Sequence, residues 1–107
     1  MKFIIAIVSN EDVTNVTKKL VVNRFYVTKL STTGQFLKDG NTTLLIGVED
    51  EKVDEVIADI NSCISKRTVT SGGVVSSIEG SLLKKPIEVT KGGATIFVLD
   101  VDRFEKL

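Results

Sequence analysis

The segment TTLLIGVEDEKVDEVIADINSCI, residues 42–64, carries both a clear strand pattern and the clearest helical pattern of the chain. Its first seven residues form an apolar run, which predicts a strand near the centre of a sheet. Acidic residues follow at 49–51, where negative charge favours the start of a helix. Apolar side chains then recur at helical spacing at Val53, Val56, Ile57, Ile60 and Ile64. The segment therefore predicts a strand over 42–48 followed directly by an amphipathic helix.

The N-terminal part of the chain has the same strand-then-helix order. KFIIAIV, residues 2–8, is a short run rich in Ile and Val, which predicts a strand buried on both faces. The residues SNED that follow are good helix caps and first-turn residues. Apolar residues then recur at helical spacing at Val13, Val16, Leu20 and Val21. This pattern predicts a helix over about 11–22 that ends near Asn23.

The remaining segments are predicted from turn residues and β-branched content. Aromatic and β-branched residues predict a strand over 25–33, and Gly and Asn then predict a loop over 34–41. Residues 65–85 are rich in Ser, Gly and Thr, which predicts a long loop of the kind that is usually functional or mobile. A short strand is predicted over 86–90 and the last strand of the core over 92–101.

The resulting order, βαββαβ, is that of an α+β ferredoxin-like sandwich, and the whole chain, 1–107, is expected to form a single domain. Its usual strand order, 4-1-3-2, places the apolar strands 2–8 and 42–48 in the centre. The last strand then lies at an edge, although it is nearly all apolar, and a bare apolar edge is an aggregation hazard. Either residues 65–90 or a neighbouring subunit is expected to cover it, and the second possibility predicts an oligomer.

Composition excludes several classes of function. Lys plus Arg equals Asp plus Glu at 14 each, so no net field attracts nucleic acid or an anionic membrane. The chain has no His and a single Cys, Cys63, which argues against a metal site, histidine-based catalysis and an intrachain disulfide. The apolar run near the N-terminus is too short for a signal peptide or a membrane span. A cytoplasmic protein without cofactor or catalytic activity is expected.

One loop has the composition of a small-molecule site. The segment TKLSTTGQFLKDGNTT, residues 28–43, offers an apolar platform at Phe36 and Leu37, two glycines that permit close backbone approach, and several hydroxyl and amide groups. The alternative is an ordinary loop in which Phe36 folds back on the core. The residue types alone leave both possibilities open.

Three runs of the chain resemble the PII-like cyclic-di-AMP receptor family. They are MKFIIAIV at the start, TKLSTTGQFLKDGNTTLLIGVEDEKVDEV at 28–56 and GGATIFVLDVDRF at 92–104. The resemblance implies a ferredoxin-like homotrimer that binds cyclic di-AMP in clefts between neighbouring subunits. It also implies a receptor without catalytic activity, which signals by loop rearrangement towards an unknown downstream partner protein.

The resemblance assigns ligand contacts residue by residue. Thr28 would hydrogen-bond the nucleotide, and Phe36 and Leu37 would line the base pocket. Asn41 and the Gly47 backbone would hold the polar edge of the ligand. Gly92, which precedes Gly93 at the start of the last strand, matches a position near the same cleft.

The sequence departs from the family pattern at three positions expected to touch the ligand. Arg24 and Tyr26 stand where family receptors usually carry Asn and Arg, and Gln35 stands where they carry a second Gly. If the strand extends through these residues, Arg24 faces the same side as Tyr26 and replaces the charge that pairs with a phosphodiester. The alternative function is a PII-like paralogue that has lost cyclic di-AMP and senses another small ligand, or only a protein partner.

Overall fold

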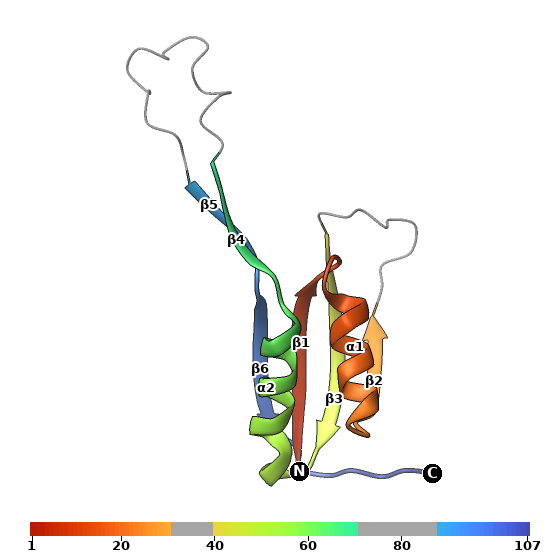
Figure 1. Cartoon of the computed structure of the whole chain (residues 1–107). Helices are drawn as coiled ribbons and strands as arrows, with labels where there is room; N and C mark the ends of the chain where they lie inside the picture. Colours follow the sequence, from red (N-terminus) through yellow and green to blue (C-terminus); the bar gives the residue numbers. More distant parts are fainter. Residues whose placement is uncertain (31–39, 71–87) are drawn as a thin grey trace, which may run out of the picture.

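The computed structural model describes residues 1–30, 40–70 and 88–107, in which two helices cover one face of a four-stranded antiparallel sheet (Figure 1). The elements are β1 (Lys2–Ser9), α1 (Val13–Val22), β2 (Val27–Leu30), β3 (Asn41–Val48), a 3₁₀ turn (Asp50–Lys52), α2 (Val53–Cys63), β4 (Lys66–Thr70), β5 (Glu88–Gly92) and β6 (Ala94–Asp100). This architecture is compatible with a ferredoxin-like fold. No helix in the described ranges is long and apolar enough to cross a membrane.

The sheet has the order β2-β3-β1-β6, which is the predicted 4-1-3-2 order when β6 is counted as its fourth strand. β1 lies between β3 and β6, and Ile5 is paired with Leu45 on one side and with Phe97 on the other. The two apolar strands predicted to be central therefore lie in the centre. β6 is an edge of the sheet within the single chain, also as predicted.

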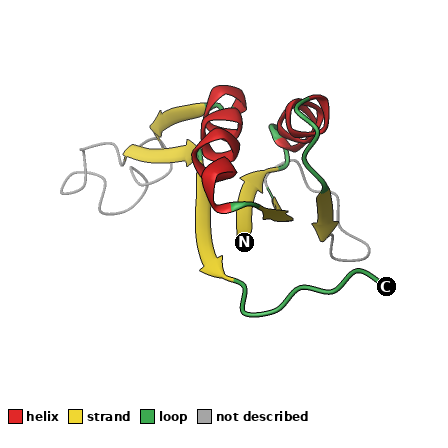
Figure 2. Cartoon of the chain, turned by 90° about the horizontal axis from the view of Figure 1, so that it is seen from below, coloured by secondary structure: helices red, strands yellow, loops and turns green. Residues whose placement is uncertain are grey.

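The core lies between the sheet and the helices. On β1, Ile4, Ala6 and Val8 have no exposed surface, and they pack with the buried side chains of α1 and α2. The alternate residues of β1 are only partly covered. The prediction that this strand is buried on both faces is therefore wrong for the single chain, because both helices pack on the same side of the sheet (Figure 2).

The end of α1 differs from the prediction in a way that affects the site. Arg24 adopts a left-handed conformation, with φ 69°, directly after the helix. The Phe25 N–H donates to the Leu20 carbonyl at 2.9 Å, and the Asn23 N–H donates to that of Lys19 at 3.1 Å, so the last turn closes on itself. β2 then begins only at Val27. Arg24 is not on the strand, and the prediction that it faces the same side as Tyr26 along an extended strand fails.

Residues 66–70 form a strand and not the predicted loop. β4 pairs antiparallel with β5 in a separate two-stranded sheet, which we call the β4–β5 ribbon, and Thr68 lies opposite Thr90. The short strand predicted over 86–90 is found at Glu88–Gly92. The rest of the predicted loop, 71–85, lies outside the described residues, as do residues 31–39. The ribbon extends away from the end of the sheet (Figure 1).

Two consecutive glycines turn the chain from β5 into β6. Gly92 has φ 90° and Gly93 φ 84°, a region that L side chains rarely adopt. A Cβ added to Gly93 would meet nothing within 4 Å, so only the backbone opposes a substitution there.

We expect Gly93→Ala to lower the free energy of unfolding by about 1–2 kcal/mol, the cost of a left-handed conformation for an L residue. Gly47→Ala is the matched control, because Gly47 lies in β3 and an added Cβ would meet only the end of the Met1 side chain, at 3.5 Å. Urea denaturation of both variants measures the difference. Equal stabilities would show that the turn does not require a positive φ.

Candidate ligand pocket

The face of the sheet opposite the helices is apolar and open in the single chain. It carries the alternate residues of the strands, and among them Phe97 is 52% exposed and Leu99 45% exposed. Ile5 and Leu45 lie between them and β2 in the register of the sheet. The C-terminal residues cross this side of the sheet near the N-terminus of β1 (Figure 2). The open face is therefore an apolar surface that the C-terminal residues cross at one end.

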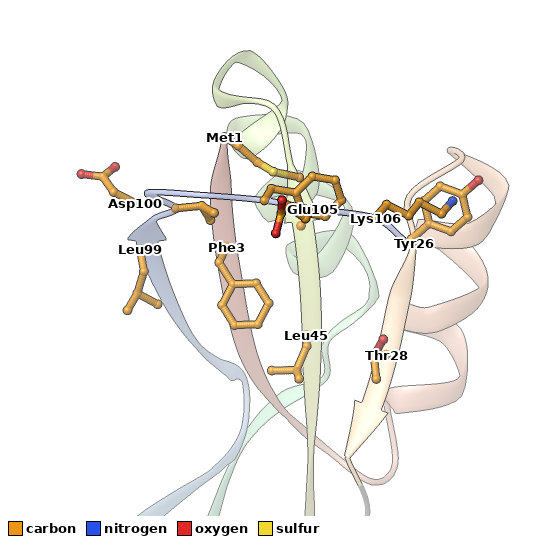
Figure 3. A pocket seen from close by; sticks show the side chains of 12 residues that line it. Met1, Phe3, Tyr26, Thr28, Leu45, Leu99, Asp100, Glu105 and Lys106 are labelled. Carbon is orange, nitrogen blue, oxygen red and sulfur yellow. The ribbon is translucent and has the colours of Figure 1, made fainter.

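A cavity of about 840 Å³ lies where the C-terminal residues cross the open face. Strand residues form its floor, and residues 101–107 contribute part of its wall (Figure 3). Its lining consists of Met1, Phe3, Tyr26, Thr28, Leu45, Gly47, Leu99, Asp100, Val101, Phe104, Glu105 and Lys106.

Sheet register explains the shape of the floor. Phe3 is paired with Gly47 on one side and with Leu99 on the other, and Thr28 is paired with Leu45. Since Gly47 has no side chain, the floor is deeper beside the Phe3 ring than a β-branched residue would allow. An aromatic ring and two leucines next to a hydroxyl form a surface that suits a flat base with polar edges.

Charged groups surround the apolar floor. Lys106 Nζ lies 5.7 Å from the centroid of the Tyr26 ring, within the range of a cation–π contact. Asp100 accepts a hydrogen bond from Lys2 and thereby raises the pKa of the Lys2 ammonium group. Glu105 pairs with Arg103 at 2.9 Å. Both carboxylates thus have cationic partners, whereas Lys106 contacts an aromatic ring at the mouth of the cavity (Figure 3).

A second hollow, of about 380 Å³, adjoins the first and shares Met1, Tyr26 and Gly47 with it. Arg24 is part of its lining. The Met1 amino group is 2.8 Å from Asp50, and the carboxylate raises the pKa of this amino group. The left-handed turn thus places Arg24 at the adjoining hollow and not on the strand that forms the floor of the main cavity.

The predicted site residues fall into three groups. Tyr26, Thr28 and Gly47 line the main cavity, and Arg24 lines the adjoining hollow. Asn41 and Gly92 lie at the other end of the sheet. Gln35, Phe36 and Leu37 lie outside the described residues.

Asn41 is six residues from Gly47 along β3, a distance of roughly 20 Å in an extended strand. The side chains of residues 41, 43, 45 and 47 point to the same face of the sheet, because a strand alternates with period two. Asn41 therefore shares the open face with Thr28 and Gly47, but it does not line their cavity. Gly92 is exposed at the turn into β6, also away from this cavity.

Sequence reasoning did not identify the floor residues Phe3, Leu45 and Leu99 or the C-terminal residues Phe104 and Lys106. The lack of polar alternation in strands 2–8 and 92–101 carried a signal, since apolar residues occupy both faces of each strand although the helices cover only one. Residues 102–107 carried no such signal, because a short polar tail has no periodicity. In the described part of the chain, no group of three or more His, Cys, Asp or Glu could hold a metal ion.

Comparison with known proteins identifies the family of this chain. The sequence profile described as "Cyclic-di-AMP receptor" matches residues 1–107. A crystal structure of a functionally unknown protein from Pediococcus pentosaceus ATCC 25745 is similar, with 39% sequence identity and a TM-score of 0.69. That match covers 99% of this chain and 96% of the other. With its full length matched by the family profile, the chain belongs to the cyclic-di-AMP receptor family.

Proposed function

We propose that this protein is a PII-like receptor that binds cyclic di-AMP and signals to a downstream protein. The observation that carries the proposal is the cavity on the open sheet face, which brings Tyr26, Thr28 and Gly47 together in a chain of the cyclic-di-AMP receptor family. A receptor of this kind is a binding protein and not an enzyme, needs no cofactor and acts in the cytoplasm.

The lining of the cavity suits a nucleotide. An adenine ring would lie against Phe3 and Leu45 beside Gly47, and the Thr28 hydroxyl would hydrogen-bond its edge. A phosphodiester is stabilised by a cationic partner, and Lys106, whose ammonium group lies over the Tyr26 ring, is part of the lining. Asn41 lies farther along the same face, outside this cavity, and the family resemblance assigns it a further contact with the ligand.

We further propose that three chains assemble with their open sheet faces inward and that the ligand binds between neighbouring subunits. Phe97 and Leu99 support this proposal, because each leaves about half of its surface exposed in the single chain. A contiguous apolar face of this kind usually marks an interface. The edge strand β6 gives a second reason, since an uncovered apolar edge favours pairing with another chain.

Thermal unfolding with a panel of nucleotides tests the proposal. Cyclic di-AMP present at about 100 times its Kd should stabilise the folded state by about 2.7 kcal/mol per site. The melting temperature should therefore rise by several degrees with cyclic di-AMP and not with AMP or cyclic di-GMP. A rise with another nucleotide but none with cyclic di-AMP would favour the alternative, a PII-like paralogue with a different ligand.

The position of Tyr26 favours that alternative enough to be tested directly. Tyr26 is 84% exposed at the mouth of the cavity, where it supplies no charge for a phosphate. We expect Tyr26→Arg to strengthen cyclic-di-AMP binding by roughly tenfold, the effect of one added charge-assisted hydrogen bond. Tyr26→Gln, which removes the ring without adding charge, is the control.

Gln35→Gly should strengthen binding further by removing a side chain from the connection between β2 and β3. Calorimetry on the double variant compares both changes with the unmodified chain. If the double variant binds cyclic di-AMP no more tightly than the unmodified chain, Tyr26 and Gln35 are not the residues that weaken its affinity.

A further inference from the structure

Residues 9–12, between β1 and α1, form a short segment that we call the bridging turn. It makes hydrogen bonds to two distant parts of the chain. On one side it contacts the start of β3. The Asn10 N–H donates to the Gly40 carbonyl at 2.9 Å, and the Thr42 hydroxyl donates to Asn10 Oδ1 at 2.5 Å. Gly40 and Thr42 flank Asn41, so Asn10 holds the chain on both sides of that residue.

On its other side the bridging turn contacts the base of the β4–β5 ribbon. Asp12 is only 4% exposed, and its Oδ2 accepts a hydrogen bond from the Ser65 N–H at 2.8 Å. The Ser65 carbonyl in turn accepts from the Gly93 N–H at 3.2 Å. Ser65 directly precedes β4, and Gly93 directly follows β5. The Asp12 carboxylate thus anchors the point where both strands of the ribbon leave the body of the protein.

The bridging turn is itself closed by local hydrogen bonds. The Asp12 N–H donates to the Ser9 carbonyl at 2.9 Å, and the Glu11 N–H donates to Ser9 Oγ at 3.3 Å. The Asp12 side chain makes no capping bond to α1, because it is turned towards Ser65. This helix-start residue, which ordinarily satisfies its own helix, is used here to hold another segment. The start of β3 and the ribbon lie at the same end of the sheet (Figure 1).

We propose that the bridging turn couples the two segments, so that a ligand contacting Asn41 alters the β4–β5 ribbon through Asn10 and Asp12. The proposal rests on the proposed function for the identity of the ligand and for the role of Asn41. Asn10 and Asp12 are positioning residues, because they act through their partners. A displacement of the chain at Asn41 changes the two hydrogen bonds to Asn10. Asp12, two residues after Asn10, holds the base of the ribbon through Ser65. The coupling is reciprocal, so a change at the ribbon alters the start of β3 by the same free energy.

Amide exchange without ligand tests the coupling first. Thr42→Val removes the hydroxyl donor at nearly constant volume, and Thr42→Ser retains it as the matched control. We expect Thr42→Val to accelerate exchange of the Ser65 and Gly93 amides roughly three- to tenfold, the effect of one ordinary hydrogen bond. Thr42→Ser should leave both rates near those of the unmodified chain. Unchanged exchange rates in Thr42→Val would overturn the proposal. Equal acceleration of amide exchange throughout α2 would also overturn it, because the substitution would then have destabilised the whole fold.

The reverse direction uses the ribbon side of the turn. Asp12→Ala removes the acceptor for the Ser65 N–H, and Asp12→Asn retains an oxygen in the same position. Ser65→Pro removes the donor without changing Asp12, and it suits the site because Ile64 is already extended at φ −90°, ψ 144°. Asp12→Ala and Ser65→Pro should both accelerate exchange of the Asn10 amide. No effect in either variant would contradict reciprocal coupling.

Ligand addition then tests the direction of signalling. Saturating cyclic di-AMP should change exchange over 66–70 and 88–92 in the unmodified chain and in Asp12→Asn. In Asp12→Ala this change should be absent, while calorimetry still shows binding, because Asp12 is not in the pocket. By reciprocity the Kd in this variant should shift by no more than the coupling factor. An identical ribbon response in Asp12→Ala would overturn the proposal. Absence of binding to the unmodified chain would instead remove the proposed function, and the ligand-free exchange rates would decide the coupling.

Discussion

We expect Phe97→Asp to convert the proposed trimer into monomers. Phe97 lies on the open face of β6, opposite Ile5, and is 52% exposed in the single chain. In the proposed trimer it is buried against neighbouring subunits, where a fully buried Phe contributes about 1.5–3 kcal/mol per chain. An Asp in its place loses this contribution and adds an unpaired carboxylate to each subunit, which costs more than the lost burial.

Val22→Asp is the matched control for this substitution. Val22 is 77% exposed near the end of α1, on the helix side of the sheet, and receives the same charge. Light scattering at micromolar concentration should give the mass of three chains for the unmodified protein and for Val22→Asp. It should give the mass of one chain for Phe97→Asp, whose far-ultraviolet circular dichroism spectrum should be unchanged. A Phe97→Asp variant that remains a trimer would show that the open face is not the interface.

We expect Gly47→Val to abolish the proposed binding of cyclic di-AMP without unfolding the protein. A Cβ at Gly47 already reaches 3.5 Å from the Met1 side chain, and the further methyl groups of Val occupy the floor beside Phe3. The base would lose its position there, and we expect the affinity to fall by roughly a hundredfold or more, about 2.7 kcal/mol. Strand stability should be kept, because β-branched residues favour strands.

Thr43→Val provides the control for the second prediction. Thr43 lies on the same face of the same strand, its substitution creates the same side chain, and it is not part of the pocket lining. Calorimetry should show near-normal affinity for Thr43→Val and no measurable heat for Gly47→Val. Comparable affinities in the two variants would place the ligand away from the floor of this cavity.

Both helices could be predicted because burial of one face imposes a period on their sequence, and the central strands because they are short, continuous apolar runs. Val56 and Ile60 are fully buried, and they belong to the stripe that predicted α2. The expected strand order followed from the two most apolar strands. The ribbon could not be predicted in the same way, because β4 and β5 pair only with each other and their residues carry no stripe that would mark a core.

The candidate site was predicted less completely than the fold. The resemblance identified Tyr26, Thr28 and Gly47, which share one cavity. Arg24 was misplaced because its left-handed conformation occurs at a residue other than Gly, where the sequence gives no turn signal. Lys106 was missed because its contact with Tyr26 depends on how residues 101–107 cross the sheet. The sequence of this segment has no periodic pattern that would predict its path.

Calorimetric titration of the unmodified protein with cyclic di-AMP tests the central claim most directly. A receptor with one cavity per chain should bind one cyclic di-AMP per subunit, three per trimer, and cyclic di-GMP should give no heat under the same conditions. The absence of heat with cyclic di-AMP at several temperatures, for a protein that is folded and trimeric, would contradict the claim that this chain is a cyclic-di-AMP receptor.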